Sequence, residues 1–358
     1  MRIVSPLLKN LVYPTLAVSG SFRRNSATGL AVVTYHGVMP QGHESVDSVL
    51  DGNLIDAEVL RSQLRLLKRH YNLITPQEFV DSIEKGSTLP AKAVLVTCDD
   101  GLLNCLTDML PVLQQEGVSC LFFVTGASAE ESRTVLWYEE LFLMFLKARS
   151  GPFEISSGGV AIQGKLADRA QRRATWRDSV KQLSRIDSTA RDSVLAALQK
   201  CFGLDLNLLT DPAATRRYGL LTCKEVRQLV SAGMTIGAHT VTHPMLSQAP
   251  PELAYKEIAE SGARLESALQ ERIWAFAYPF GDSQSVTPEV QAMPQRAGYK
   301  AAFLNFGGGF GSALPLYAVP RIHITAGMNM SEFEAHVSGF YARWQRYAGR
   351  LSLAASRR

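Results

Sequence analysis

The segment His239-Thr240-Val241-Thr242-His243 carries two imidazoles four residues apart. On a helical turn this spacing places both rings on one face, where they can reach one ion. Two histidines and one carboxylate form a ligand set with an open position for water, as in catalytic zinc sites. The spacing alone is equally compatible with two unrelated histidines. Gly237 before the segment and Pro244 after it, at the end of a predicted strand, favour the metal site.

Two adjacent carboxylates, Asp99 and Asp100, follow the apolar run of residues 93–98 and precede Gly101. Neighbouring side chains on an extended or turn backbone point apart. One carboxylate can therefore bind a metal while the other faces a reacting water. The alternative is an ordinary Asp-Gly turn or a helix N-cap. Together with the histidine pair, the sequence favours the metal and base interpretation.

Other polar residues also stand at the ends of predicted strands. His36 ends the first strand, Tyr278-Pro279-Phe280-Gly281-Asp282 follows a later one, and the last strand carries Arg321 and His323. Enzymes built on barrels place their catalytic groups at the C-terminal ends of parallel strands. We therefore expect these side chains to meet in one site.

Short apolar runs alternate with helical spacing along the chain, which predicts parallel βαβ units. We predict an α/β fold, a single distorted (β/α) barrel of about seven strands. The predicted strands are residues 31–36, 73–75, 93–98, 120–124, 234–238, 273–277, 300–304 and 317–324.

Residues 130–217 interrupt this alternation with three helical patterns, at residues 137–148, 167–185 and 189–201. They predict a helical insertion in a barrel domain. The predicted organisation is an N-terminal segment of residues 1–28, a barrel of residues 29–330, and a C-terminal helix with a basic tail over residues 331–358.

The composition excludes several classes of protein. A chain of 358 residues with 46% hydrophobic residues and a net charge of +4 is neither disordered nor of low complexity. Its basic residues are not concentrated as in a nucleic-acid binder, so we expect no nucleic-acid partner. Five cysteines without a C-x-x-C pair argue against a disulfide framework and favour a reducing compartment.

The N-terminal segment is too short and too polar for a membrane span, and Lys9 and Pro14 interrupt any signal-peptide core. We expect a protein that is cytoplasmic or peripheral on the cytoplasmic face of the membrane. The segment either lies on a membrane surface or packs on the domain. The basic and aromatic residues of 341–358 leave the same choice between anionic lipid and a solvated helix face.

Three motifs resemble those of the polysaccharide deacetylases, the family-four carbohydrate esterases with a NodB homology domain. Residues 96–101 (VTCDDG) and 121–126 (LFFVTG) resemble the first motif, T-F-D-D-G with a later F-F-V-x-G. Residues 239–244 (HTVTHP) resemble the second motif, H-[ST]-x-x-H-P. Residues 276–281 (FAYPFG) resemble the third, F-R-x-P-Y-G. The resemblance spans about residues 30–324, interrupted by the insertion.

The resemblance implies a role for each matching residue. Asp99 is implied as the general base, and the backbone N–H of Phe280 as an oxyanion donor. The implied cofactor is a divalent metal, foremost Zn²⁺, with Co²⁺, Ni²⁺, Mn²⁺ or Fe²⁺ as alternatives. Its implied ligands are Asp100, His239 and His243. We also expect the substrate to contact Tyr35, Tyr278 and Pro279.

The chain departs from the family pattern in the residue that orients the base. Cys98 replaces the usual Phe, and Ala277 stands where the third motif has Arg. Arg321, within Val319-Pro320-Arg321, resembles the Pro-Arg motif of one branch. We predict that Arg321 replaces the missing Arg. The alternative is a surface ion pair.

The general acid is the second departure. Residues 34–38 (TYHGV) resemble the N-terminal Tyr-His motif of a circularly permuted branch of the family. This resemblance predicts His36 as the acid, with His323 as the alternative.

The predicted function is a metal-dependent hydrolase of the N-acetyl group of an amino sugar. The predicted substrate is a polysaccharide, peptidoglycan or a lipid-linked glycan precursor. The alternatives are a non-catalytic glycan-binding relative and a hydrolase of non-sugar amides on the same fold. The sequence leaves the oligomeric state open.

Overall fold

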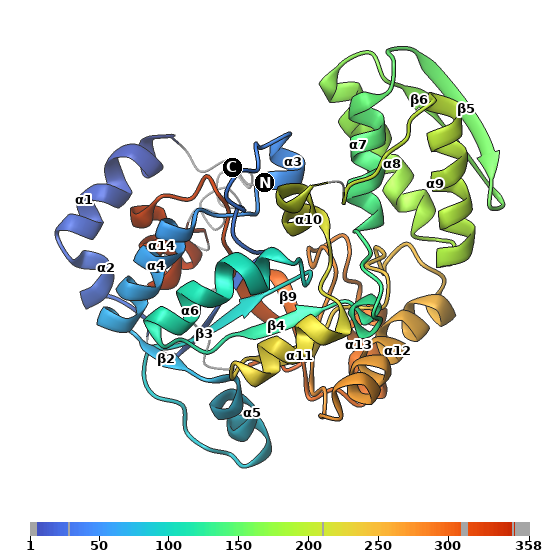
Figure 1. The fold of residues 1–358 in the computed structure, drawn as a ribbon. Coiled ribbons are helices and arrows are strands. Elements are labelled where there is room, and N and C mark those ends of the chain that lie inside the picture. The colour runs from blue at the N-terminus through green and yellow to red at the C-terminus, as the bar shows by residue number, and fades with distance from the viewer. Residues whose placement is uncertain (1–5, 28, 210, 309–313, 346, 348–358) are drawn as a thin grey trace, which may run out of the picture.

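A closed barrel of seven parallel strands forms the centre of the computed structural model, which describes residues 6–27, 29–209, 211–308, 314–345 and 347 (Figure 1). The first strand pairs with the last on one side and with β3 on the other, so the sheet closes. This confirms the predicted (β/α) barrel. Around the barrel the strands are β1 (Leu30–Tyr35), β10 (Val319–His323), β9 (Ala301–Gly307), β8 (Ala275–Ala277), β7 (Thr235–Ala238), β4 (Leu121–Val124) and β3 (Ala93–Cys98).

The pairing of the buried strand β3 with β1 determines which residues lie together at the end of the barrel. It pairs with β1 along its whole length, from Leu30 opposite Ala93 to Tyr35 opposite Cys98. This register brings the residues that follow each strand, His36 and Asp99, to the same end of the barrel. A short extra strand, β2 (Asn72–Ile74), pairs with the first half of β3.

Side chains alternate between two apolar layers, as strand geometry requires. Val32, Leu95 and Phe303 belong to the cluster inside the barrel. Val33, Val96 and Ala302 belong to the cluster between the strands and the helices around them. The same alternation continues at the strand ends. It determines which side chains there face the barrel interior and which face the surrounding helices.

Helices cover the outside of the barrel. Two of them begin with capping boxes, Thr75 with Glu78 and Thr222 with Glu225. The elements are α3 (Ser48–Asp51), α4 (Ala57–His70), α5 (Pro76–Glu84), η2 (Cys105–Met109), α6 (Leu110–Glu116), η3 (Gly126–Ala129), α11 (Cys223–Ser231), α12 (Pro251–Leu269), α13 (Pro288–Arg296) and α14 (Met330–Val337).

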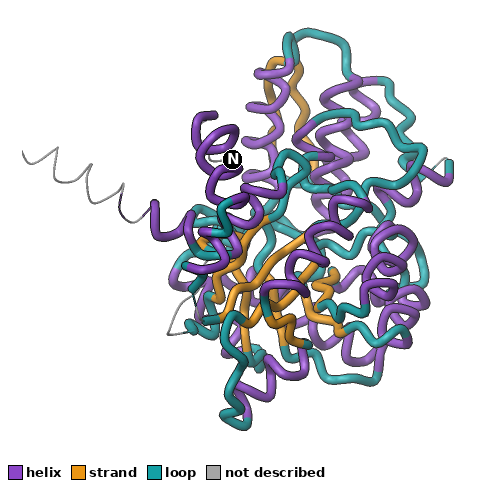
Figure 2. The backbone as a smooth tube through the Cα atoms, turned by 90° about the vertical axis from the view of Figure 1, so that its left-hand side faces the viewer, coloured by secondary structure: helices purple, strands orange, loops and turns teal. Residues whose placement is uncertain are grey.

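The insertion forms a lobe beside the barrel with an apolar core of its own (Figure 1). Besides helices it contains a hairpin that the sequence analysis did not predict, at the top of Figure 2 and apart from the barrel strands. Gly158 and Gly159, with φ of 56° and 78°, form its turn, and this Gly-Gly pair was the available signal. The elements are α7 (Trp137–Lys147), β5 (Pro152–Ser157), β6 (Val160–Lys165), α8 (Arg169–Leu183), α9 (Ser188–Phe202) and α10 (Pro212–Tyr218).

Near the N-terminus, η1 (Leu8–Val12), α1 (Tyr13–Val18) and α2 (Ser21–Arg24) pack on α14. The C-terminal helix predicted from residue 331 onwards is interrupted, because Gly339 takes a φ of 73° after α14 ends. Helical backbone resumes at residues 340–345. The predicted basic residues at 348–358 lie outside the described residues. Within the described ranges, every helix is too short or too polar to span a bilayer.

Candidate active site

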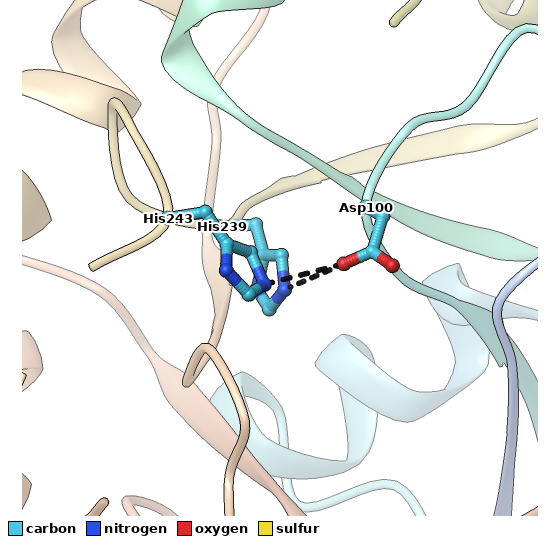
Figure 3. Close-up of side chains that lie close together, drawn as sticks. All are labelled: Asp100, His239 and His243. Atoms are coloured by element: carbon cyan, nitrogen blue, oxygen red, sulfur yellow. Dashed lines mark ion pairs between the residues drawn. The ribbon is translucent and has the colours of Figure 1, made fainter. Parts of the chain in front are cut away.

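Asp100, His239 and His243 converge at the C-terminal ends of β3 and β7 (Figure 3). The Oδ1 atom of Asp100 lies 3.4 Å from Nε2 of His239 and 3.3 Å from Nε2 of His243. All three side chains are buried, and their ligand atoms lie within 4.8 Å of one another. The two imidazole nitrogens and the carboxylate oxygen match the donors that Zn²⁺ and similar divalent ions take. This set could therefore hold a metal ion.

Charge and hydrogen bonding in this set suit a cation. Burial would raise the pKa of Asp100, but contacts with His239 and His243 hold the pKa well below its usual value. Burial lowers the pKa of His243, which favours the neutral imidazole that binds metals. The Nδ1 atom of His239 lies 2.8 Å from the carbonyl oxygen of Ala277, and this contact directs Nε2 towards Asp100.

The loop from His239 to His243 does not follow ordinary backbone geometry. Thr240 and His243 both have positive φ, 61° and 59°, which is costly for residues other than glycine. Glu257 of α12 stabilises the loop. Its carboxylate accepts hydrogen bonds from the backbone N–H groups of Val241 and Thr242, each at 2.8 Å, and from the Thr242 hydroxyl at 2.6 Å.

Asp99 and Arg321 form a buried, bidentate ion pair inside the barrel. Nη1 of Arg321 donates to Oδ1 of Asp99 at 2.7 Å, and Nη2 donates to Oδ2 at 2.5 Å. The guanidinium also donates to the Thr97 hydroxyl and the Leu304 carbonyl. Burial would raise the pKa of Asp99, but Arg321 holds it below the usual value. The structure thus brings the two residues together as predicted, and the alternative of a surface ion pair is wrong.

The two candidate acids, His36 and His323, lie side by side with ring centroids 4.9 Å apart. Burial and the neighbouring His36 lower the pKa of His323 to about 3. Among the described residues, Nδ1 of His36 and Nε2 of His323 have no hydrogen-bond partner. The geometry brings both histidines to the site and does not choose between them.

Asn104 fixes the backbone that follows His36. Its Oδ1 accepts a hydrogen bond from the N–H of Val38 at 3.1 Å. Gly37 makes this contact possible, because it has a φ of 119° and a Cβ there would lie 2.0 Å from the same oxygen. A glycine is therefore required beside the candidate acid.

The turn after β8 presents Phe280 to the site. Phe280 has a φ of 60°, and its backbone N–H has no hydrogen-bond partner among the described residues. Its ring centroid lies 5.0 Å from that of His243. The turn thus lies beside the candidate metal set, and the role of its N–H as an oxyanion donor stays a prediction.

The predicted substrate contacts of Tyr35 and Tyr278 are wrong. Both are buried and point into the outer apolar layer, because alternation along a strand turns them away from the interior. The Tyr35 hydroxyl donates to Gln63, and the Tyr278 hydroxyl donates to the carbonyl of Tyr317. Pro279 is also buried, and its carbonyl accepts the N–H of Gly281 in the turn that presents Phe280.

The insertion contributes residues that the sequence analysis missed. The ring of Tyr138 in α7 lies 4.9 Å from that of His243 and 5.5 Å from that of Phe280. Arg191 of α9 donates to the hydroxyl of Thr242 at 2.6 Å. Neither residue belongs to a motif, so no sequence signal marked them.

Comparisons with known proteins show which family and fold this chain resembles. A family model described as polysaccharide deacetylase matches residues 209–302. The Bacillus subtilis (strain 168) protein named "Putative polysaccharide deacetylase YxkH" is 23% identical over 117 residues, 33% of this chain and 41% of that protein. The match thus spans less than half of the curated relative.

Solved structures extend the likeness to most of the chain. The Streptococcus pyogenes deacetylase PplD in complex with acetate has a TM-score of 0.53 at 17% identity, covering 87% of this chain and 99% of that one. IcaB from Ammonifex degensii has a TM-score of 0.54 at 18% identity, covering 87% and 98%. At this identity they show the shared fold.

Residues 209–302 thus resemble the polysaccharide deacetylase family, and the barrel has the fold of the similar solved structures. The matched residues 209–302 contain His239, His243 and Phe280, whereas Asp99 and Asp100 precede them. Assignment to the branch with the Tyr-His motif stays a prediction.

Proposed function

We propose that this chain is a metal-dependent hydrolase that removes the acetyl group from an N-acetylated amino sugar. One arrangement carries the proposal: a buried set of Asp100, His239 and His243 beside the carboxylate of Asp99, which Arg321 holds. The match of residues 209–302 to the polysaccharide deacetylase family model supports a carbohydrate substrate. The proposed substrates are a polysaccharide, peptidoglycan or a lipid-linked glycan precursor.

The three ligands would hold a divalent cation and leave a coordination position open. Zn²⁺ suits this donor set best, and Co²⁺, Ni²⁺, Mn²⁺ and Fe²⁺ are alternatives. When bound, such a cation supplies Lewis acidity and lowers the pKa of water in the site.

Asp99 would act as the general base. The guanidinium of Arg321 keeps its carboxylate ionised and in one orientation. Each carboxylate oxygen has two lone pairs, so an oxygen bonded to Arg321 can still accept a proton from water. The water that loses this proton attacks the acetyl carbonyl carbon.

The remaining groups would stabilise charge and the leaving group. The N–H of Phe280 would donate to the carbonyl oxygen as it becomes negative. His36 would give a proton to the departing amine. We favour His36 over His323 because residues 34–38 resemble the Tyr-His motif, and burial lowers the pKa of His323. The rings of Tyr138 and Phe280 would form an apolar wall against the sugar or the acetyl methyl.

Acetate release tests the proposal. The substrates are N-acetylglucosamine oligomers, a generic acetyl ester and a non-sugar acetamide, assayed before and after chelation. We expect release from the oligomers to stop on chelation and to return with Zn²⁺ or Co²⁺. A chain that binds metal but hydrolyses none of the three would be a glycan-binding relative. Hydrolysis of the non-sugar amide alone would contradict the substrate class.

Substitution of each histidine separates the two candidate acids. His36→Ala should lower kcat by about 10²- to 10⁴-fold, as loss of a general acid does, with the metal content unchanged. His323→Ala is the matched variant and should retain more activity. Survival of activity in His36→Ala together with its loss in His323→Ala would reverse the assignment.

A further inference from the structure

The N- and C-terminal helical segments expose most of the large apolar side chains found at the described surface. Leu7, Leu11 and Val18 are 63%, 60% and 90% exposed. Their spacing of four and seven residues places them on one face of the helical run of residues 6–18, and we call them the apolar stripe. Trp344 and Tyr347, 43% and 59% exposed, lie after Phe340.

The opposite face of the same run is firmly packed. Tyr13 is fully buried, and its ring meets those of Phe22 and Phe340 edge-on at 6.2 and 6.3 Å. Two ion pairs fix the segment to α14, Lys9 with Glu332 at 3.0 Å and Arg23 with Glu334 at 2.7 Å. The fold therefore holds the apolar stripe in place with its side chains outward.

Basic residues outnumber acidic ones in the segments that carry the stripe. The described residues 6–27, 29–43, 335–345 and 347 contain Lys9, Arg23, Arg24 and Arg343 and no Asp or Glu. Glu332 and Glu334, which lie beside the segment, are buried in the ion pairs with Lys9 and Arg23. An apolar stripe among basic residues complements a surface of anionic lipid headgroups.

We propose that residues 6–24 bind the surface of an anionic lipid bilayer, with the apolar stripe inserted at the boundary between headgroups and acyl chains. A second copy of the chain is the less favoured occupant. A twofold contact would bring the basic residues of this segment against their own copies, and like charges oppose this. Trp344 and Tyr347 add aromatic side chains of the kind that favour the bilayer interface.

Vesicle flotation of the full chain tests the proposal, with phosphatidylcholine vesicles that contain or lack phosphatidylglycerol. We expect binding to the anionic vesicles that weakens at high salt. The double variant Leu7→Glu/Leu11→Glu should bind at least about tenfold less, because two exposed apolar side chains no longer insert. Val46→Glu changes a side chain that is 40% exposed outside the segment, and should bind like the wild type.

Three results would overturn the proposal. They are no flotation with either vesicle, equal flotation of the double variant, and a dimer that the double variant abolishes in a chain that does not bind vesicles. Brominated lipid gives an independent readout, since it should quench the wild type more than Trp344→Phe. Metal content and acetate release on soluble oligomers should stay unchanged in the double variant, which verifies its fold.

Discussion

Arg217 and Arg321 are two fully buried arginines that each hold carboxylates in different parts of the molecule. Arg321 reaches from β10 across the barrel to Asp99. Arg217 of α10 holds Asp51 at 2.6 Å and Glu139 at 2.8 Å, and so ties α3 to helix α7 of the insertion. Only the carboxylate of Asp99 stands next in sequence to a candidate metal ligand.

The two clusters differ in what surrounds them. Both oxygens of Glu139 bond to Arg217, and both oxygens of Asp51 accept hydrogen bonds. Burial raises the pKa of Glu139 in spite of Arg217, whereas Arg321 outweighs burial and lowers the pKa of Asp99. Among the described residues near Asp99, ring nitrogens of His36, His243 and His323 have no partner. Nε2 of His43, 3.8 Å from Oδ1 of Asp51, has no hydrogen-bond partner in the described part of the chain either. The difference is therefore one of position: the Asp99 pair lies beside the candidate metal ligands, whereas the Arg217 cluster joins two helices.

The largest effect that we expect is a loss of stability when Arg217 is replaced. Arg217→Met should lower the free energy of unfolding by about 3–5 kcal/mol, because Asp51 and Glu139 would remain buried without their cation. Thermal unfolding measures this. Arg216→Met on the same helix removes a partly exposed ion pair with Asp108 and should cost at most about 1 kcal/mol.

The activity of Arg217→Met shows whether the Arg217 cluster also takes part in catalysis. If Arg217→Met does not fold, Arg217→Lys gives a milder version of the same change. The kcat per folded molecule should stay close to that of the wild type. An unchanged unfolding transition with a collapsed kcat would show that the Arg217 cluster is catalytic.

Arg321→Lys tests the ion pair between Arg321 and Asp99. Lysine keeps the positive charge but loses the planar fork that reaches both oxygens of Asp99. We expect kcat to fall by about 10- to 100-fold, as for a lost charge-assisted hydrogen bond, with KM and metal content unchanged. A wild-type kcat, or a loss confined to thermal stability, would contradict a role for Arg321 in positioning the base.

The smallest effect that we expect is a weaker affinity for metal when Glu257, which stabilises the loop from His239 to His243, is replaced. Glu257→Gln should weaken the three hydrogen bonds to Val241 and Thr242 and raise the metal dissociation constant by about tenfold. Competition with a chelator measures this constant. Glu260→Gln, on the same helix but more exposed, is the matched control. Equal constants in the two variants would show that the loop keeps its shape without Glu257.

The strand ends could be predicted from sequence because each functional side chain follows a short apolar run. Asp99, His239 and Phe280 come from different strands, and closure of a parallel barrel brings them to one end. The alternation of side chains also explains the error at Tyr35 and Tyr278. Each tyrosine follows a residue whose side chain points into the barrel, so its own side chain points outward.

The other residues around the site could not be predicted, because their contacts arise from tertiary packing and leave no local pattern in the sequence. Arg217, Glu257 and Tyr138 lie on helices, and their spacing within each helix is that of ordinary surface or core residues. Their partners are distant in sequence, as with Arg217 and Asp51, so only the assembled fold pairs them. The Asp99–Arg321 pair could be predicted because a missing Arg at Ala277 left the base without a cation.

The central claim is that Asp99 is a base beside a metal bound by Asp100, His239 and His243. The most direct test measures metal per chain and acetate release from N-acetylglucosamine oligomers in the wild type and in Asp99→Asn. We predict about one metal ion per chain in both, since the three ligand residues are retained. We predict that acetate release falls by about 10²- to 10⁴-fold in the variant. A wild type without metal, or a variant that keeps full release, would contradict the account.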